Sequence, residues 1–563
     1  MSTRSPQRRP SWSSLRRRPW RRDGLAGLVL GVESVPDGLA QGLLAGVNPV
    51  YGLHGYIVGT AFAALATSSA FMAVQATGAM SIIVADVGAI ASADDPARAV
   101  FTLSVLTGVV MLAAGLLKLG SLVRFVSNAV MVGFLSAVGV NIILGQLDDF
   151  TGYEAEGANR ILRTFDLLIH PGRIHWPTLA VGAATIALIV LLEKSPLGSL
   201  GMVVAVVVTS ASVSLGDLDV AQLGDIAEVP NALPLPKAPD ISLLPQLLVP
   251  AVSLAFVGLV QGAGISSSFP NPDGSFPDAS RDFVGQGVGN VASGILQGMP
   301  VGGSMSATTL VKEAGARSRM ALIVAGAVMA LLVLTLGGLV EQIAMPALAG
   351  LLIIVGFRTV KVDRIMAVVH TGAFPAVVLL VTFVLTMLIA LQYAVLVGVG
   401  ISMILTIISR SNAVVVKSWE LDAKGRLREV DPPAEVPEGE VVVLQPYGSL
   451  FFASAPVFES LLPAIGPETA GSVVIIRLRG FDDLGSTFTG VLGRYASDLR
   501  ATGSKLVIVS ASERVVDQLE ATGALVTIGT DNLYPSDQFL GATLRAARND
   551  AVEWVEQHRP ESS

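Results

Sequence analysis

Charged side chains are scarce through the long central part of this 563-residue chain. Residues 23–412 contain 16 Lys and Arg and 23 Asp and Glu, about one charge in ten positions, whereas soluble proteins carry about one in four. Residues 1–22 contain eight Arg and no acid, and residues 413–563 contain 34 charged residues. A soluble domain could not keep so few charges over such a length. The sequence therefore excludes a cytosolic enzyme and predicts a polytopic membrane domain with a polar C-terminal part.

About fourteen apolar segments, separated by short polar turns, make up the central region. Two of them are interrupted by small residues and too short to cross a hydrocarbon core of about 30 Å as helices. Short segments in corresponding halves of a chain indicate a transporter binding site. We expect an α-helical membrane domain built as a seven-plus-seven inverted repeat with two half-helices, at 76–92 and 303–314. The other segments are predicted at 24–46, 51–67, 98–117, 122–146, 176–193, 197–215, 243–265, 283–299, 317–340, 345–358, 372–389 and 391–409.

The charges between the segments predict the orientation. Basic residues such as Lys118, Lys194 and Arg358 fall on the same side as the basic arm at 1–22, and the acidic loop 216–241 falls on the other side. Because basic loops remain in the cytoplasm, we expect both termini to be cytoplasmic. The protein would then be a multi-pass protein of the cell membrane.

Small and hydroxyl-bearing residues begin both half-helices, at 74–81 and 300–309. The first turn of a helix has unpaired N–H groups and a positive dipole end, and small residues let an anion approach them. Two such ends from opposite halves would form an anion site without a formal positive charge. The alternative is close helix packing through small residues, which is common in membranes. The hydroxyl donors would be Thr77, Ser304, Ser306 and Thr308.

Two carboxylates lie within the first apolar segment. Glu33 and Asp37 are four residues apart and share a helix face, with Pro36 between them. Ionisable residues inside a membrane are functional candidates, and a buried carboxylate can carry a proton. The alternative is a pair satisfied by the backbone groups that Pro36 frees.

The C-terminal part alternates between strands and helices. Strands are predicted at 440–445, 472–478 and 505–509, and helices at 455–462, 487–500, 513–522 and 538–557. This alternation is typical of a small α/β domain. We place a Pro-rich acidic linker at 413–439, the domain at 440–547 and a tail at 548–563.

Metal and covalent chemistry find little support in the sequence. Cys is absent and the five His are scattered, so we expect no metal, no cofactor and no catalytic residues. No nucleic-acid partner is expected either.

Several motifs in order resemble the sulfate permease (SulP-type) anion transporters that carry a C-terminal STAS domain. The resemblance covers residues 23 to about 545. The matching segments are 48–53 (NPVYGL), 68–69 (SS), 282–290 (DFVGQGVGN), 298–306 (GMPVGGSMS), 315–319 (GARSR) and 344–352 (AMPALAGLL), together with Pro36.

The resemblance implies a core domain and a gate domain, elevator-like movement between them, and a homodimer. It implies that the substrate anion binds between the two half-helices. Many members have Arg where this chain has Ala307, and a carboxylate where it has Gln261, which leaves Glu33 and Asp37 as better proton-coupling candidates. The matching substrate-binding positions are Gln75, Ala76, Thr77, Gly78, Ser304, Met305, Ser306, Ala307 and Thr308.

In regulatory STAS relatives, a Ser or Thr at a helix start can be phosphorylated. Ser486 and Thr487 occupy that region, but Gly485 stands where the usual Asp precedes the hydroxyl residue. The alternative role of these hydroxyls is a helix cap.

Together, these features predict a secondary active transporter of small inorganic or carboxylate anions in the lipid bilayer, coupled to protons. Sulfate is the first candidate, followed by bicarbonate or a dicarboxylate. Three alternatives remain open. A nucleobase symporter would be expected to have carboxylates in its eighth and tenth helices, an uncoupled anion channel would pass large currents, and a membrane-anchored STAS regulator would bind a cytosolic partner and transport nothing.

Overall fold

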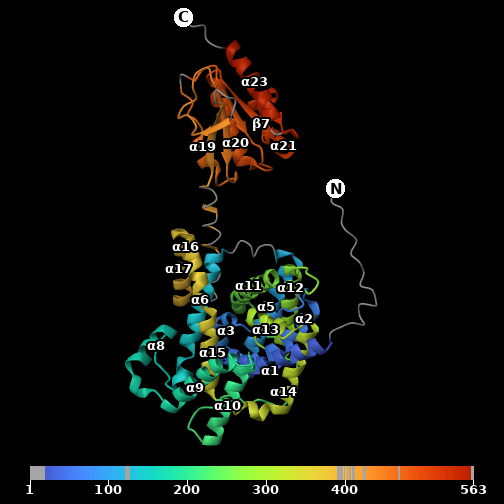
Figure 1. Ribbon diagram of the computed structural model, residues 1–563, viewed down its shortest axis with the longest axis vertical. Coiled ribbons are helices and arrows are strands. Elements are labelled where there is room, and N and C mark those ends of the chain that lie inside the picture. The colour runs from blue at the N-terminus through green and yellow to red at the C-terminus, as the bar shows by residue number, and fades with distance from the viewer. Residues whose placement is uncertain are drawn as a thin grey trace. The chain divides into compact units, whose positions relative to one another are not determined.

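The computed structural model describes residues 20–558, except 121–126, 199, 422–426, 467–468, 540 and most of 390–412. The chain forms two compact units, Met1–Ser402 and Met403–Ser563 (Figure 1). The first is helical, and the second combines a sheet with helices.

The first half of the helical unit contains long helices interrupted by one short strand and one half-helix. Its elements are α1 (Trp20–Leu44), α2 (Pro49–Ala66), β1 (Ala73–Gln75), α3 (Gly78–Ala85), α4 (Gly88–Ala91), α5 (Pro96–Leu116), α6 (Asn128–Gly145), α7 (Leu147–Thr151), α8 (Arg160–Ile169), α9 (Trp176–Glu193) and α10 (Leu200–Gly216).

The second half repeats the order of two long helices, a strand, a half-helix and further long helices. This repeated order is the one expected of an inverted repeat, although most of the predicted segment 391–409 lies outside the described residues. The elements are α11 (Leu244–Ser268), α12 (Ala279–Ile295), β2 (Gly302–Ser304), α13 (Met305–Glu313), α14 (Met320–Val340), α15 (Met345–Thr359), α16 (Val362–Thr371) and α17 (Ala373–Leu388).

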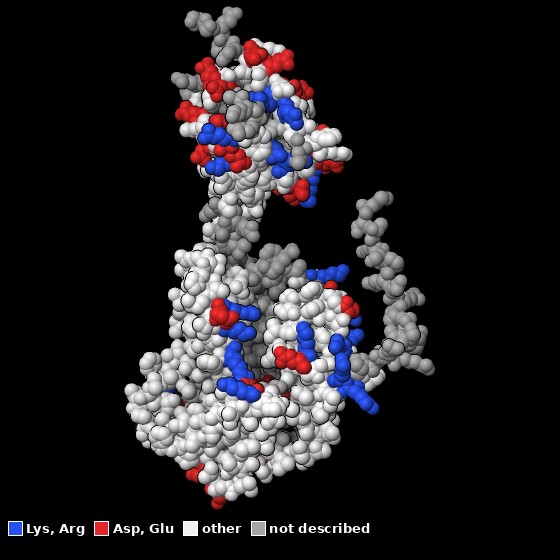
Figure 2. Space-filling model, viewed as in Figure 1, with Lys and Arg blue, Asp and Glu red and all other residues white. Residues whose placement is uncertain are grey.

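Many of these helices are suited to a bilayer. Among the described residues, six are long and apolar enough to cross a membrane, and α10 and α17 are shorter apolar helices. On the face drawn in Figure 2, charged residues are sparse over the helical unit and frequent over the C-terminal unit. The uneven charge distribution of the sequence therefore corresponds to two structural units.

The long helices form two packed groups. In the first group α5 packs on α11 and α12, α2 packs on α12, and α1 packs on α2 and α14; in the second, α15 packs on α6 and α9, and α6 on α17 (Figure 1). Helices α5 and α12 approach closely through glycines: a Cβ on Gly287 would lie 2.9 Å from the carbonyl oxygen of Gly108. The half-helix α3 contacts α1 and α11 of the first group and α6 of the second.

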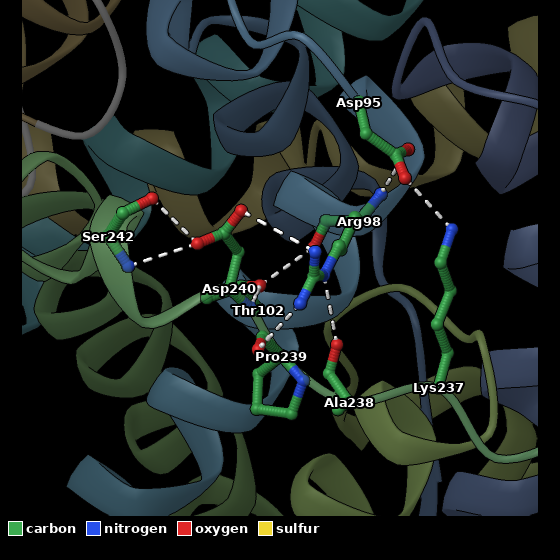
Figure 3. A network of polar contacts seen from close by, with 8 residues as sticks. All are labelled: Asp95, Arg98, Thr102, Lys237, Ala238, Pro239, Asp240 and Ser242. Carbon is green, nitrogen blue, oxygen red and sulfur yellow. Dashed lines mark hydrogen bonds and ion pairs between the residues drawn. The ribbon is translucent and has the colours of Figure 1, made fainter.

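The segment before α11 is fixed to the start of α5 by a cluster around Arg98 (Figure 3). The Arg98 Nε atom donates to the carbonyl oxygen of Ala238 at 3.1 Å. Lys237 Nζ lies 2.9 Å from Asp95 Oδ2, and the backbone N–H of Asp240 donates to Thr102 Oγ1 at 2.8 Å. These contacts hold the end of the loop between the two repeats against the first helix group.

The C-terminal unit is built on a six-stranded sheet in the order β4-β3-β5-β6-β7-β8. Strands β5 to β8 are parallel, and β3 and β4 are antiparallel. Alternate strand residues face α19–α22 on one side and α23 on the other. The bounds are β3 (Val415–Leu421), β4 (Leu427–Val430), β5 (Val441–Tyr447), α19 (Ala455–Leu461), β6 (Val473–Arg477), α20 (Gly485–Ala501), β7 (Lys505–Ala511), α21 (Glu513–Ala521), α22 (Ala524–Ile528), β8 (Leu533–Pro535) and α23 (Ala542–Gln557).

Three boundaries differ from the sequence-based expectation. The supposed linker 413–439 contains β3 and β4, and β3 is hydrogen-bonded to β5, so this stretch is part of the sheet. Helix α23 runs through the position where the tail 548–563 was expected to begin. Of the basic arm 1–22, residues 1–19 lie outside the described residues, and the last three already belong to α1.

Candidate functional site

The two half-helices are joined by a short antiparallel pairing between the strands that precede them. Ala73 lies opposite Ser304, and Gln75 lies opposite Gly302. Because α3 and α13 begin directly after these strands, the pairing brings their amino ends together from opposite halves of the chain. The two ends carry the N–H groups and the positive dipole that favour an anion.

Three polar residues of α12, spaced four residues apart, hold both strands in place. Asp282, which is fully buried, accepts hydrogen bonds from the turn before β1, including one of 2.6 Å from a Thr hydroxyl. Gln286 Oε1 accepts from the backbone N–H of Gly303 at 3.0 Å. Asn290 bonds both backbone groups of Val301, at 2.6 and 2.9 Å. The polar side chains of the motif at 282–290 therefore position the candidate site by holding the backbone around β1 and β2.

Strand β2 can pack directly against α11 because two of its three residues are glycines and have no side chain. A Cβ on Gly303 would lie 2.9 Å from the Cα atom of Gly262 in α11, and a Cβ on Gly302 would lie 3.0 Å from the Cα atom of Gly258. Any larger residue would force α11 and β2 apart, so these glycines are required by close backbone approach.

The four predicted residues of the first half differ in what they contact. Gln75 is buried and donates from Nε2 to Ser34 in α1 at 2.9 Å. The carbonyl oxygen of Ala76 accepts a hydrogen bond from a tyrosine of α2. Thr77 is half-buried and donates to Gln261 Oε1 at 3.1 Å rather than capping its own helix. Gly78 begins α3.

The five predicted residues of the second half also divide into two sets. Ser306 and Met305 are exposed at the first turn of α13, and the Ser304 and Ser306 hydroxyls lie 3.2 Å apart. Ala307 and Thr308 are buried, and Thr308 bonds the carbonyl oxygen of Ser304 at 2.6 Å. The groups free to meet a ligand therefore lie at the start of the helix.

A polar network links the first helix to this site. Tyr56 lies with its hydroxyl oxygen 2.6 Å from Asp37 Oδ2 and 2.9 Å from the carbonyl oxygen of Ala76. Gln41, one turn after Asp37, accepts from the Ser81 hydroxyl in α3 at 2.9 Å. The helix continues through Pro36 without a break. Glu33 lies one turn before Asp37 and is partly buried.

Sequence reasoning missed Tyr56, Gln41 and Ser81. Gln41 extends the i, i+4 row formed by Glu33 and Asp37, so its position on that helix face was readable from the sequence. Tyr56 and Ser81 come from other elements, and only the tertiary fold brings Tyr56 to Asp37 and Ser81 to Gln41.

The far end of α3 carries a charged contact. Asp86 caps α3 and lies 3.1 Å from Arg160 Nη2, at the start of α8, with both side chains largely buried. Helix α8 packs on α6 of the second helix group, so this ion pair connects the half-helix to that group.

Metal ligation finds no support among the described residues, where no group of three His, Asp or Glu side chains could hold an ion. In the C-terminal unit, Ser486 and Thr487 are exposed in the first turn of α20, and their phosphorylation stays a prediction.

Comparison with known proteins decides the family. The model of the sulfate permease family matches residues 21–382, and that of the STAS domain matches residues 432–538. The chain belongs to the sulfate permease family and carries a C-terminal STAS domain. Membership makes it a multi-pass membrane transporter of anions rather than an enzyme.

The relatives are similar over almost their full length. A probable sulfate transporter of Mycobacterium tuberculosis is 25% identical over 92% of this chain and 94% of its own. The bicarbonate transporter BicA of Synechocystis is 26% identical over 96% of both chains. The structure of SLC26A9 superposes with a TM-score of 0.82 at 18% identity, covering 97% of this chain and 93% of the other, which shows a shared fold.

Proposed function

We propose that this sulfate permease family member is a secondary active transporter of small anions, with sulfate as the first candidate and bicarbonate or a dicarboxylate next. The observation that carries the proposal is the β1–β2 pairing, which joins the amino ends of α3 and α13. Thr77 and Ser306 stand beside these ends, and the hydroxyl of each is hydrogen-bonded to an uncharged side chain. Relatives named for sulfate and for bicarbonate support this order of candidates.

In this proposal the driving ion is a proton carried by Asp37. One hydroxyl hydrogen on Tyr56 cannot be donated to both Asp37 and the carbonyl oxygen of Ala76. A protonated Asp37 supplies the second hydrogen: it donates to Tyr56, and Tyr56 donates to Ala76. Loss of that proton leaves the hydroxyl with two competing acceptors. The protonation of Asp37 is thereby linked to the backbone at the candidate site.

Alternating access is proposed to be elevator-like, with the first helix group moving against the second. The half-helices are hydrogen-bonded to α1 and α12 of the first group. Their contact with the second group at Gly78 is apolar, since a Cβ there would lie 2.4 Å from Ile142 Cδ1. Apolar contacts can slide without breaking hydrogen bonds, whereas the ion pair between Asp86 and Arg160 must break or move with the half-helix. A homodimer in the cell membrane, with both termini cytoplasmic, completes the proposal.

Uptake into liposomes tests this function. Purified protein is reconstituted, and uptake of labelled sulfate, bicarbonate and fumarate is measured with and without an inward proton gradient. At least one anion should accumulate, and the gradient should raise its initial rate several-fold. Large ion currents without coupling would indicate a channel instead. No uptake of any anion under any gradient would contradict the proposal.

A further inference from the structure

The C-terminal unit has a polar edge that no transport step uses. Strands β5 to β8 run parallel, so their carboxyl ends share one edge of the sheet. The chain lies at that edge six residues before α23 begins, because the N–H of Ser536, just after β8, donates to the carbonyl oxygen of Ala511, the last residue of β7. Helix α23 ends at the opposite edge, where a Cβ on Gly471 would lie 3.2 Å from the carbonyl oxygen of His558. Ligands of α/β proteins commonly bind at the carboxyl ends of the strands.

Two arginines at this edge have no acidic partner among the described residues. Arg477 ends β6 on the face that carries Val473 and Ile475, which is the α23 face, and Arg479 follows in the turn after the strand. Arg477 donates to Gln445, and its guanidinium carbon lies 4.9 Å from the centre of the Trp419 ring. Burial and the charge of Arg479 lower the pKa of Arg477. Neither guanidinium forms an ion pair with a carboxylate of the described residues, so the positive charge of the pair is not neutralised.

Two polar atoms of the C-terminal unit, one just after β6 and one on α23, are buried and have no hydrogen-bond partner among the described residues. They are Arg479 Nη1 and the hydroxyl oxygen of Thr543, in the first turn of α23. The residue before this helix, Gly541, provides no side-chain cap, so first-turn N–H groups are available as well. Leaving a buried polar group unpaired costs about 1–3 kcal/mol, and more for a charged one. A ligand that accepts hydrogen bonds would remove this cost.

We propose that Arg477, Arg479 and Thr543, the STAS edge site, bind a small tetrahedral oxyanion such as phosphate or sulfate, either free or as the end group of a larger molecule. The planar guanidinium matches the geometry of such an anion and supplies paired donors. The Thr543 hydroxyl and the first-turn N–H groups of α23 supply donors on the other side. The proposal does not depend on the transport function, because all of these residues lie in the C-terminal unit.

Equilibrium dialysis of the full chain in detergent tests the STAS edge site. Labelled phosphate is used with the Ser306→Glu variant, in which the candidate transport site carries a negative charge. We expect saturable binding of one phosphate per chain, weakened at least tenfold in Arg479→Gln and at least threefold in Thr543→Val. The matched control is Arg494→Gln, which removes an exposed arginine paired with Glu459 and should leave binding unchanged.

Competition distinguishes the two sources of the anion. Displacement by sulfate as readily as by phosphate indicates a free oxyanion, and displacement by a phosphate monoester at tenfold lower concentration indicates a larger molecule. As an independent readout, phosphate should change the fluorescence of Trp419, and the change should vanish in Trp419→Phe. The absence of saturable phosphate binding, or equal affinity in Arg479→Gln, would overturn the proposal.

Discussion

The hydroxyl oxygen of Tyr56 lies 2.6 Å from Oδ2 of Asp37. This contact joins a carboxylate of α1 to the short connection between β1 and α3, since the same hydroxyl also reaches the carbonyl oxygen of Ala76. Protonation of Asp37 can therefore change the hydrogen bonding of the backbone beside the candidate anion site, although Asp37 itself lies outside that site. The predictions below begin from this link.

Replacing Asp37 by Asn should uncouple transport from protons. Asn is nearly isosteric and always carries N–H hydrogens, so it imitates the protonated acid. Anion exchange should continue in liposomes, while the stimulation by an inward proton gradient disappears. Tyr56→Phe should weaken the stimulation as well, because it removes the hydroxyl between Asp37 and Ala76. A gradient effect of normal size in Asp37→Asn would refute proton coupling through this residue.

Asn290→Ala should destabilise the helical unit. The change leaves the N–H and C=O groups of Val301 without their buried partner, which should cost about 1–3 kcal/mol for each group. The melting temperature and the transport rate should both fall. Asn141→Ala is the control, since its buried amide makes long contacts of 3.4 Å, one to the carbonyl oxygen of Thr386 and one to the sulfur of Met387. Equal losses in the two variants would argue against a special role for Asn290.

The stability that the ion pair between Arg160 and Asp86 provides should be restored when the two charges are exchanged. Both side chains are largely shielded from solvent, so Arg160→Asp should leave two carboxylates facing each other and lower the melting temperature. The double variant Arg160→Asp with Asp86→Arg should restore most of the loss. The coupling expected for residues in contact is about 0.5–3 kcal/mol. Purely additive effects would show that the pair does not connect α3 to α8.

The Arg98 cluster should make stability sensitive to acid. The pKa of Asp95 lies below its usual value, chiefly because its side chain accepts from the backbone N–H of Arg98, and then because of Lys237. A lowered folded-state pKa adds stability above the unfolded value of about 3.9, and this stability is lost as the pH falls through the folded value. Asp95→Asn should therefore lower the melting temperature at pH 7, and the difference from wild type should shrink as the pH drops below 4.

Much of the membrane fold was readable from the sequence, because apolar length and small-residue interruptions are local signals. The half-helices begin at Gly78 and Met305, two residues after the predicted starts, and the predicted segment 76–92 is divided into α3 and α4. The pairing of Gln75 with Gly302 could not be predicted, since it depends on glycines of α11 and on side chains of α12 that are distant in sequence. The same holds for Tyr56, whose contact with Asp37 is tertiary.

The C-terminal unit shows where local signals mislead. The acidic, Pro-rich stretch near Asp431 resembles a linker, yet β4 ends just before it, and Lys417 of β3 forms an ion pair with that residue. The central strands at 472–478 and 505–509 were predicted because they are continuous apolar runs, which is typical of buried parallel strands. Strand β8 has only three residues and offered no such pattern.

The most direct test of the anion site is the uptake of the best transported anion by Ser306 variants in liposomes. Ser306→Ala should retain uptake, and Ser306→Gln should reduce it through size alone. Ser306→Glu, which matches Gln in size but adds a negative charge at the start of α13, should abolish it. Equal uptake in the Gln and Glu variants, or normal uptake in Ser306→Glu, would contradict an anion site between the two half-helices.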